Sequence, residues 1–181
     1  MESVGIHRGS DVVSAVLREL WEGILPFLAA VLFHELGHLA GSIPAGVPLR
    51  RFGAGFTGLR MDFALEQASY LQELIVLLSG SLFGLSTLFW ISHPSYRRWA
   101  LVLNLANLLP VRGLDGGGIL TCFLHHWMDG DRADRIGRVV FGICGVLFWF
   151  GGMWMVLRAG GSVTWMLCGM ILAAGEIRSQ K

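Results

Sequence analysis

The stretch WEGILPFLAAVLFHELGHLAG, residues 21–41, joins a long apolar run to three ionisable side chains near its end, His34, Glu35 and His38. A helix needs about 20 mostly apolar residues to cross the hydrocarbon layer of a bilayer, and this stretch has that length. A charged side chain at membrane depth costs about 2.5 to 3.5 kcal/mol on insertion scales. Three ionisable groups within five residues therefore predict either a functional site or a polar cluster that holds helices together.

The composition of the whole chain points to the membrane. Of its 181 residues, 54% are hydrophobic and 15% are charged, against about 25% charged in a soluble domain. The mean hydropathy is +0.59. These values exclude a disordered chain and a soluble enzyme. The formal net charge of +1 offers no basic surface for phosphates, so no nucleic acid partner is expected. The three cysteines, Cys122, Cys144 and Cys168, are isolated and predict neither a disulfide nor a thiolate metal site.

The apolar runs predict an all-α polytopic membrane protein with about five transmembrane helices in a single domain, residues 1–181. Residues 1 to about 20 lack the features of a signal peptide, so the first apolar segment is expected to be retained. The five predicted spans run approximately from Trp21 to Gly41, Tyr70 to Ser92, Trp99 to about His125, Ile136 to Leu157 and Val163 to Ile177.

Between the first two spans, residues 50–63 predict a small membrane-associated β-hairpin. Apolar residues alternate with glycine or polar residues here, and period two indicates a strand. The alternating apolar residues are Phe52, Ala54, Phe56, Leu59, Met61 and Phe63. The Thr57-Gly58 pair predicts the turn. Since open strand edges cannot face lipid unpaired, this hairpin must line a cavity, pack on helices or add a strand from a partner.

Orientation follows from the basic residues, which favour the cytoplasmic side. With five spans, the face opposite the N-terminus carries most of them: Arg50, Arg51, Arg60, Arg132, Arg135, Arg138, Arg178 and Lys181. The N-terminus is therefore predicted to lie outside. The polar residues of the first span then lie nearer the cytoplasmic face.

His34 and His38 are four residues apart, so they share one helix face and can bind a single zinc ion. Glu35, next to the first ligand, is placed to take a proton from water. The alternative is a hydrogen-bonded polar cluster without metal. Zinc needs a third ligand from another segment, and Asp115 in the third span meets that need at a comparable depth, because the first and third spans run in the same direction. Pro110 and the neighbouring glycines predict a break in the helix there.

These residues resemble the site-2 protease family of intramembrane zinc metalloproteases. The first signature matches His34-Glu35-Leu36-Gly37-His38, and the second matches Asn107-x-x-Pro110 with Leu114-Asp115-Gly116. The resemblance covers a three-helix catalytic core, about residues 21–125. It implies that His34, His38 and Asp115 ligate one zinc ion, that Glu35 is the catalytic base and that Asn107 lies near the scissile bond.

In the same resemblance, the hairpin corresponds to a membrane-associated β segment that pairs with an extended substrate, and we predict that Phe52, Phe56 and Leu59 contact that substrate. The chain departs from the family at Ser79–Gly84, where many members carry proline and asparagine. It lacks the PDZ or CBS domain of some relatives, and its last two spans, about residues 136–177, align with nothing in the family.

The predicted function is hydrolysis of peptide bonds in transmembrane or membrane-associated proteins, in the plasma membrane of a prokaryote. In this function Asn107 donates to the oxyanion, although capping of the broken helix is an equal alternative. A non-proteolytic relative that binds transmembrane partners is the rival prediction, and the intact Glu35 speaks against it. A transporter or metal channel would spread its polar residues over the membrane depth, whereas here they cluster at one level.

Overall fold

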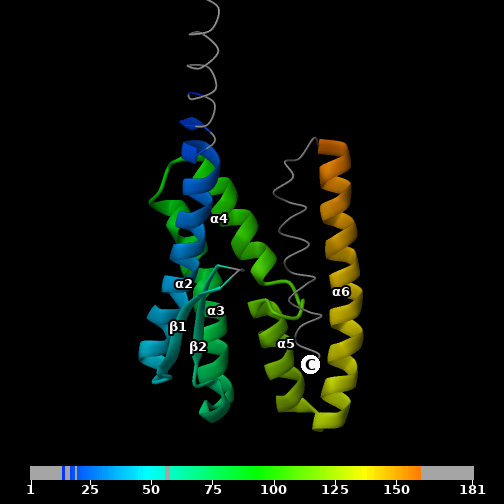
Figure 1. Ribbon diagram of the computed structural model, residues 1–181. Helices are drawn as coiled ribbons and strands as arrows, with labels where there is room; N and C mark the ends of the chain where they lie inside the picture. Colours follow the sequence, from blue (N-terminus) through cyan, green and yellow to red (C-terminus); the bar gives the residue numbers. More distant parts are fainter. Residues whose placement is uncertain (1–13, 15–16, 19, 56–57, 160–181) are drawn as a thin grey trace, which may run out of the picture.

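The computed structural model describes residues 14, 17–18, 20–55 and 58–159 and is mostly helical, with one two-stranded antiparallel sheet (Figure 1). The elements are the π-helix η1 (Leu20–Ile24), α2 (Leu25–Ala45), β1 (Leu49–Gly55), β2 (Gly58–Phe63), the 3-10 helices η2 (Leu65–Gln67) and η3 (Thr87–Phe89), α3 (Tyr70–Ser86), α4 (Pro94–Asn107), α5 (Asp115–Trp127) and α6 (Gly130–Ala159). The predicted fifth span, Val163 to Ile177, lies outside the described residues.

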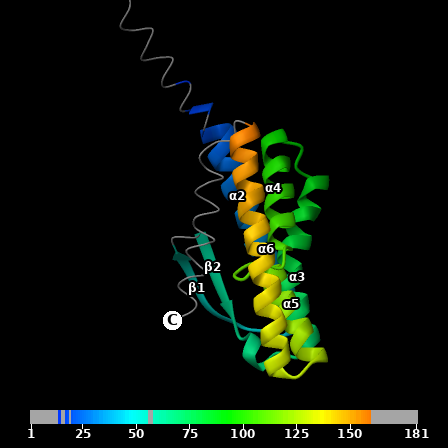
Figure 2. The ribbon, with the colours of Figure 1, turned by 90° about the vertical axis from the view of Figure 1, so that its right-hand side faces the viewer.

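The helices form a layered bundle in which the chain reverses its direction from α2 to α3, from α3 to α4 and from α5 to α6 (Figure 1). Helices α2, α3 and α4 pack against one another, α5 continues in the direction of α4 and packs on α3, and α6 packs on α5. Figure 2 shows α6 in front of the bundle and the hairpin to one side. The first and third predicted spans therefore run in the same direction, as the sequence predicts.

Small residues bring α2 and α3 into close contact. A side-chain carbon at Gly37 would lie 2.6 Å from the carbonyl oxygen of Ser79, and one at Gly41 would overlap the Ser79 side chain. Small residues at such an interface let two backbones approach closely, which is how helices associate where lipid removes the hydrophobic driving force. The Ser79–Gly84 segment therefore packs tightly although it lacks the proline and asparagine of the family pattern.

Two buried clusters of mostly small side chains lie at opposite ends of α2. Ala30, Tyr96 and Ala100 pack together where α2 meets α4. Ala45 and Val76 pack with Val47 near the base of the hairpin. The metal-ligand histidines predicted from the sequence lie on the segment of α2 between these two clusters, so both ends of that segment are held in place.

The predicted break in the third span is present, and the span is two helices. Helix α4 ends at Asn107 and α5 begins at Asp115. Gly113, in the connecting loop, has φ +87°. A side-chain carbon at Gly116 would overlap the carbonyl group of Leu108, so the loop folds back onto the start of α5. The predicted start at Trp99 is wrong: α4 begins at Pro94, since proline is favoured in the first turn of a helix.

Replacing Gly113 with alanine tests this loop. A side chain at this φ costs of order 1–3 kcal/mol, although a carbon atom there would meet nothing within 4 Å. We therefore expect Gly113→Ala to lower the midpoint of thermal unfolding in detergent, through backbone strain alone. Gly130→Ala, also in open space, is the control. Equal midpoints for the two variants would contradict the assigned backbone conformation.

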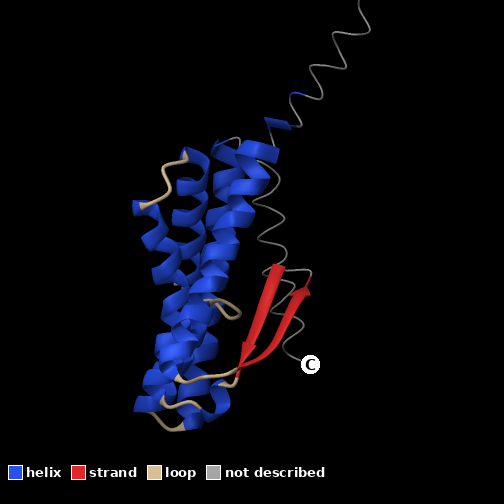
Figure 3. Cartoon of the chain, turned by 90° about the vertical axis from the view of Figure 1, so that its left-hand side faces the viewer, coloured by secondary structure: helices blue, strands red, loops and turns tan. Residues whose placement is uncertain are grey.

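The predicted hairpin is present, with β1 and β2 paired antiparallel so that Phe52 lies opposite Met61 and Gly55 opposite Gly58. Because Gly58 is already paired, the predicted turn at Thr57-Gly58 is one residue too late, and the connection is residues 56–57, outside the described residues. The register shifts between Leu49 and Arg51. Among the described elements, β2 is the strand that packs on α2, and Figure 3 shows the sheet along one side of the bundle.

Two helical segments are long and apolar enough to cross a membrane, Leu20–Ala45 and Tyr70–Phe89. The first therefore extends beyond the predicted end at Gly41, and the second ends before Ser92. At about 1.5 Å per residue, α4 alone is too short to cross, because the break shortens it. The predicted fourth span, Ile136 to Leu157, lies within α6.

Candidate metal centre

His34, His38 and Asp115 come together from two helices that lie far apart in the sequence. The Nε2 atoms of His34 and His38 are 3.2 Å apart. Oδ2 of Asp115 lies 3.2 Å from Nε2 of His34 and 3.3 Å from Nε2 of His38. These three side chains, called here the three-ligand cluster, can hold a metal ion.

The three potential ligand atoms form a nearly equilateral triangle whose size fits a small divalent ion. A tetrahedral ion with bonds of about 2.0–2.1 Å has ligand atoms about 3.3–3.4 Å apart. The observed sides of 3.2, 3.2 and 3.3 Å are close to that value. The arrangement thus supplies three of four tetrahedral positions, as catalytic zinc sites in proteins do.

Both imidazoles use their other nitrogen for a buried hydrogen bond. His34 Nδ1 lies 2.9 Å from Oδ1 of Asn104, and His38 Nδ1 lies 2.8 Å from the carbonyl oxygen of Val76. A carbonyl oxygen can only accept, so each Nδ1 carries the proton and each Nε2 presents a lone pair. Oδ2 of Asp115 is buried and has no hydrogen-bond donor. Three lone pairs therefore point at one another without a proton between them. A bound cation would remove the repulsion among these lone pairs.

Local structure explains how each ligand reaches the centre. His34 and His38 lie one turn apart on α2, and both are buried. Asp115 is the first residue of α5, so the broken helix places its carboxylate at the end of a helix instead of along one. Gly80 on α3 leaves room for the His38 ring, because a side-chain carbon there would overlap it.

The two predicted catalytic residues border the three-ligand cluster. Glu35 is half-buried on α2 and interacts electrostatically with all three members of the cluster. Asn107 is the last residue of α4, and its Nδ2 lies 3.1 Å from Nε2 of His34. The residue at the end of α4 thus directs its amide at the centre, whereas the C-cap residue of the helix is Leu108.

Neither a scan against protein-family models nor a search of the curated proteins finds a match for this chain.

The three hairpin residues predicted to contact substrate have different outcomes. Phe52 lies on β1 with 62% of its surface exposed. Phe56 lies outside the described residues. Leu59 lies on β2 opposite Ala54, and its side chain is not among those described. The hairpin does approach the centre through another residue: the ring of Phe63 lies 6.5 Å from that of His38, centroid to centroid.

The sequence interpretation missed the residues behind the ligands. Asn104 contacts His34, Gly80 leaves room for His38, and Gly84 leaves room for Asn104. Asn104 had a visible signal, because it is the one amide in the apolar stretch ALVLNLA, residues 100–106, and lies one helical turn before Asn107. The sequence gives no comparable signal for the role of the two glycines, which stand out only as part of the departure from the family pattern.

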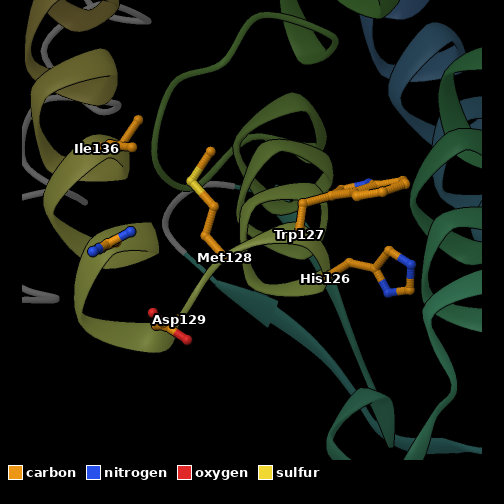
Figure 4. A pocket seen from close by; sticks show the side chains of 6 residues that line it. His126, Trp127, Met128, Asp129 and Ile136 are labelled. Atoms are coloured by element: carbon orange, nitrogen blue, oxygen red, sulfur yellow. The ribbon is translucent and has the colours of Figure 1, made fainter.

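A separate cavity lies at the corner between α5 and α6 (Figure 4). It measures about 620 Å³ and is lined by His126, Trp127, Met128, Asp129, Arg132 and Ile136. None of the cluster residues lines it. His126 stacks on Tyr70 with centroids 4.1 Å apart, and Nε2 of His125 lies 3.2 Å from a carboxylate oxygen of Asp134. These histidines thus have packing partners, and we assign this cavity no part in the chemistry.

Proposed function

We propose that this chain is an intramembrane zinc metalloprotease that resembles the site-2 protease family and cleaves transmembrane or membrane-associated proteins. The observation that carries the proposal is the buried triangle of Nε2 of His34, Nε2 of His38 and Oδ2 of Asp115, whose sides match a tetrahedral zinc ion. His34 and His38 also flank Glu35 in the spacing H-E-x-x-H, so one turn of α2 supplies the base and two of the three ligands.

A zinc ion held by these three residues would act as a Lewis acid and make a water molecule acidic near neutral pH. Glu35, half-buried beside the ligands, accepts the proton of the attacking water and later passes it to the leaving amine. With the lone pair of His34 Nε2 used by a bound metal ion, the Asn107 amide would be free to donate to the substrate's carbonyl oxygen. Glu35 of α2 then supplies the base, and Asn107 of α4 supplies the hydrogen-bond donor.

The substrate must be extended to reach this centre, since the carbonyl groups of an intact helix are hydrogen-bonded and sheltered. Strand β2 of the hairpin packs on α2, and Phe63 brings the hairpin to His38. An unwound substrate segment that adds a strand to the hairpin would obtain there the main-chain hydrogen bonds that lipid cannot give. The hairpin and the centre would therefore act together.

The proposal includes the membrane arrangement predicted from the sequence: five spans, an outside N-terminus, a centre nearer the cytoplasmic face and the plasma membrane of a prokaryote. The two candidate membrane-spanning helices and the exposed apolar side chains along α6, such as Ile143, Val146 and Leu147, support insertion in a bilayer. A large exposed apolar surface of this kind needs a partner, and lipid is the one that suits a long helix.

A non-proteolytic binding protein of the same fold is the second candidate. It needs no base, whereas Glu35 is present and interacts with the ligands. A metal transporter would place polar groups along a path, whereas the three-ligand cluster occupies one level.

Metal removal tests the proposal. Protein purified in detergent is expected to contain about one zinc per chain and, in liposomes, to cleave members of a panel of single-span membrane proteins. Chelation should abolish cleavage, and zinc should restore it. Cleavage that survives complete removal of metal, or a folded chain without stoichiometric metal, would overturn the assignment.

Substrate pairing is tested at Phe52. In a hairpin closed by the Gly55–Gly58 pair, ladder bonds alternate, so Phe52, three residues before Gly55, is expected to present its N–H to the free edge of β1. Phe52→Pro removes that donor. The cleavage rate should fall at least about tenfold, which corresponds to a loss of roughly 1.4 kcal/mol of hydrogen-bonding free energy, and the zinc content should not change. Phe52→Ala keeps the N–H and is the control. Equal cleavage by the two variants would argue against strand pairing at this edge.

A further inference from the structure

Asn104 of α4 contacts the metal centre from outside both sequence signatures. Its side chain is fully buried, and its Oδ1 lies 2.9 Å from Nδ1 of His34. A buried amide in an apolar helix is costly unless all of its polar atoms are paired. The pairing of this amide therefore shows what the residue does.

The amide has only one orientation that satisfies both of its ends. Its Nδ2 donates to the carbonyl oxygen of Ala100 at 2.6 Å, and that oxygen can only accept. Oδ1 must then face His34, and because Oδ1 also only accepts, the proton of the imidazole lies on Nδ1. The lone pair of His34 is left on Nε2, the atom that points to His38 and Asp115.

Gly84 of α3 makes the space for this amide. A side-chain carbon at Gly84 would overlap the amide atoms of Asn104. His38, in contrast, is held by the backbone carbonyl of Val76, which no substitution removes. Among the described residues, Asn104 is therefore the side chain that holds a ligand imidazole by its Nδ1.

We propose that Asn104 is a positioning residue that fixes the tautomer and rotation of His34 so that Nε2 is presented to the metal ion. Partners of this kind behind a ligating histidine commonly change metal affinity by about 10- to 100-fold when they are removed. The inference rests on the proposed metal site, and it adds to that site a residue from α4, the helix between the two signatures.

The test compares Asn104→Leu, which keeps the branching at Cγ but removes both polar atoms, with Asn104→Asp, which keeps the size of the side chain and an acceptor oxygen. Zinc affinity is measured by competition with a chelator in detergent. We expect Asn104→Leu to bind zinc about 10- to 100-fold more weakly, and Asn104→Asp to stay within a few-fold of the unmodified chain, because a carboxylate also accepts from Nδ1. Tyr96→Phe is the matched control, since it removes another buried hydrogen bond of α4, to Thr87, without touching His34.

A second measurement reads the tautomer directly and needs no metal. In metal-free protein labelled with ¹⁵N-histidine, correlation spectra should show His34 protonated on Nδ1 in the unmodified chain and in Asn104→Asp. In Asn104→Leu, or in Asn104→Ala if the leucine variant does not fold, a mixture with the Nε2-protonated form is expected. Cobalt in place of zinc should likewise change its visible spectrum in the leucine variant only.

Equal zinc affinity of Asn104→Leu and the unmodified chain would overturn the role of Asn104 and leave the proposed function standing. Protonation of His34 on Nε2 in the metal-free unmodified chain would do the same. Absence of stoichiometric zinc from the unmodified chain would overturn the proposed function and, with it, the positioning role.

Discussion

Replacing Asp115 with alanine is expected to reduce bound zinc from about one ion per chain to almost none, because only His34 and His38 then remain of the three ligands that a catalytic zinc site needs. Oδ2 of Asp115 is buried without a hydrogen-bond donor, so the substitution leaves no orphaned partner that would unfold the protein. Elemental analysis of the monodisperse fraction in detergent gives the number of ions per chain.

Glu35→Gln is the matched variant, because it changes a neighbouring carboxylate that is not a proposed ligand. It should keep about one zinc per chain while cleavage falls by about 10²- to 10⁴-fold, the usual contribution of a general base. Zinc retained in Asp115→Ala would break the link between the two signatures. Cleavage retained in Glu35→Gln would remove Glu35 from the chemistry without touching the metal site.

Gly80→Ala is the second substitution with a large expected effect, although Gly80 is not a ligand. A side-chain carbon at this position would overlap the His38 ring, and forcing extra atoms into a packed interior costs about 1–3 kcal/mol. Either α3 moves away from α2 or the His38 ring rotates and loses its 2.8 Å contact with the carbonyl oxygen of Val76. Both responses open the triangle of ligand atoms.

We therefore expect Gly80→Ala to lose most of its zinc, measured per folded chain after size exclusion, and to unfold at a lower temperature. Gly142→Ala in α6 is the control, since a carbon atom there meets nothing within 4 Å. Because glycine inside a helix is destabilising, its replacement should leave the stability of this control unchanged or raise it by about 0.5–1 kcal/mol. Zinc binding by Gly80→Ala at the level of the control would show that α3 does not constrain His38.

The sequence predicted the hairpin and the broken helix because both rest on local chemistry. Alternation over residues 52–63 indicates strands whatever packs on them, and the pair of Pro110 with the glycine-rich stretch that follows prevents a continuous helix. The errors lie at boundaries. Helix α4 begins at Pro94, and Gly58 belongs to β2 and not to the turn, because a few competing contacts decide an element's end.

The ligands were predictable for a different reason: a metal site requires particular residue types, and an apolar chain offers few of them. His34 and His38 have helical spacing, and Asp115 is the carboxylate at a matching depth in the third span. The place of Asn107 near the centre was predicted from the Asn107-x-x-Pro110 motif. The sequence by itself therefore determined which residues form the three-ligand cluster.

Only the tertiary structure decided what holds these ligands in place. The partners of His34 and His38 are Asn104 and the carbonyl group of Val76. Gly80 leaves the space for the His38 ring, and Gly84 leaves the space for the Asn104 amide. No local pattern predicts such contacts, because a backbone carbonyl has the same chemistry at every residue and a glycine is informative only when its neighbour across the helix interface is known. Periodicity and residue type thus determine elements and ligands, whereas the relative placement of α2, α3 and α4 determines which nitrogen of each histidine is free to bind.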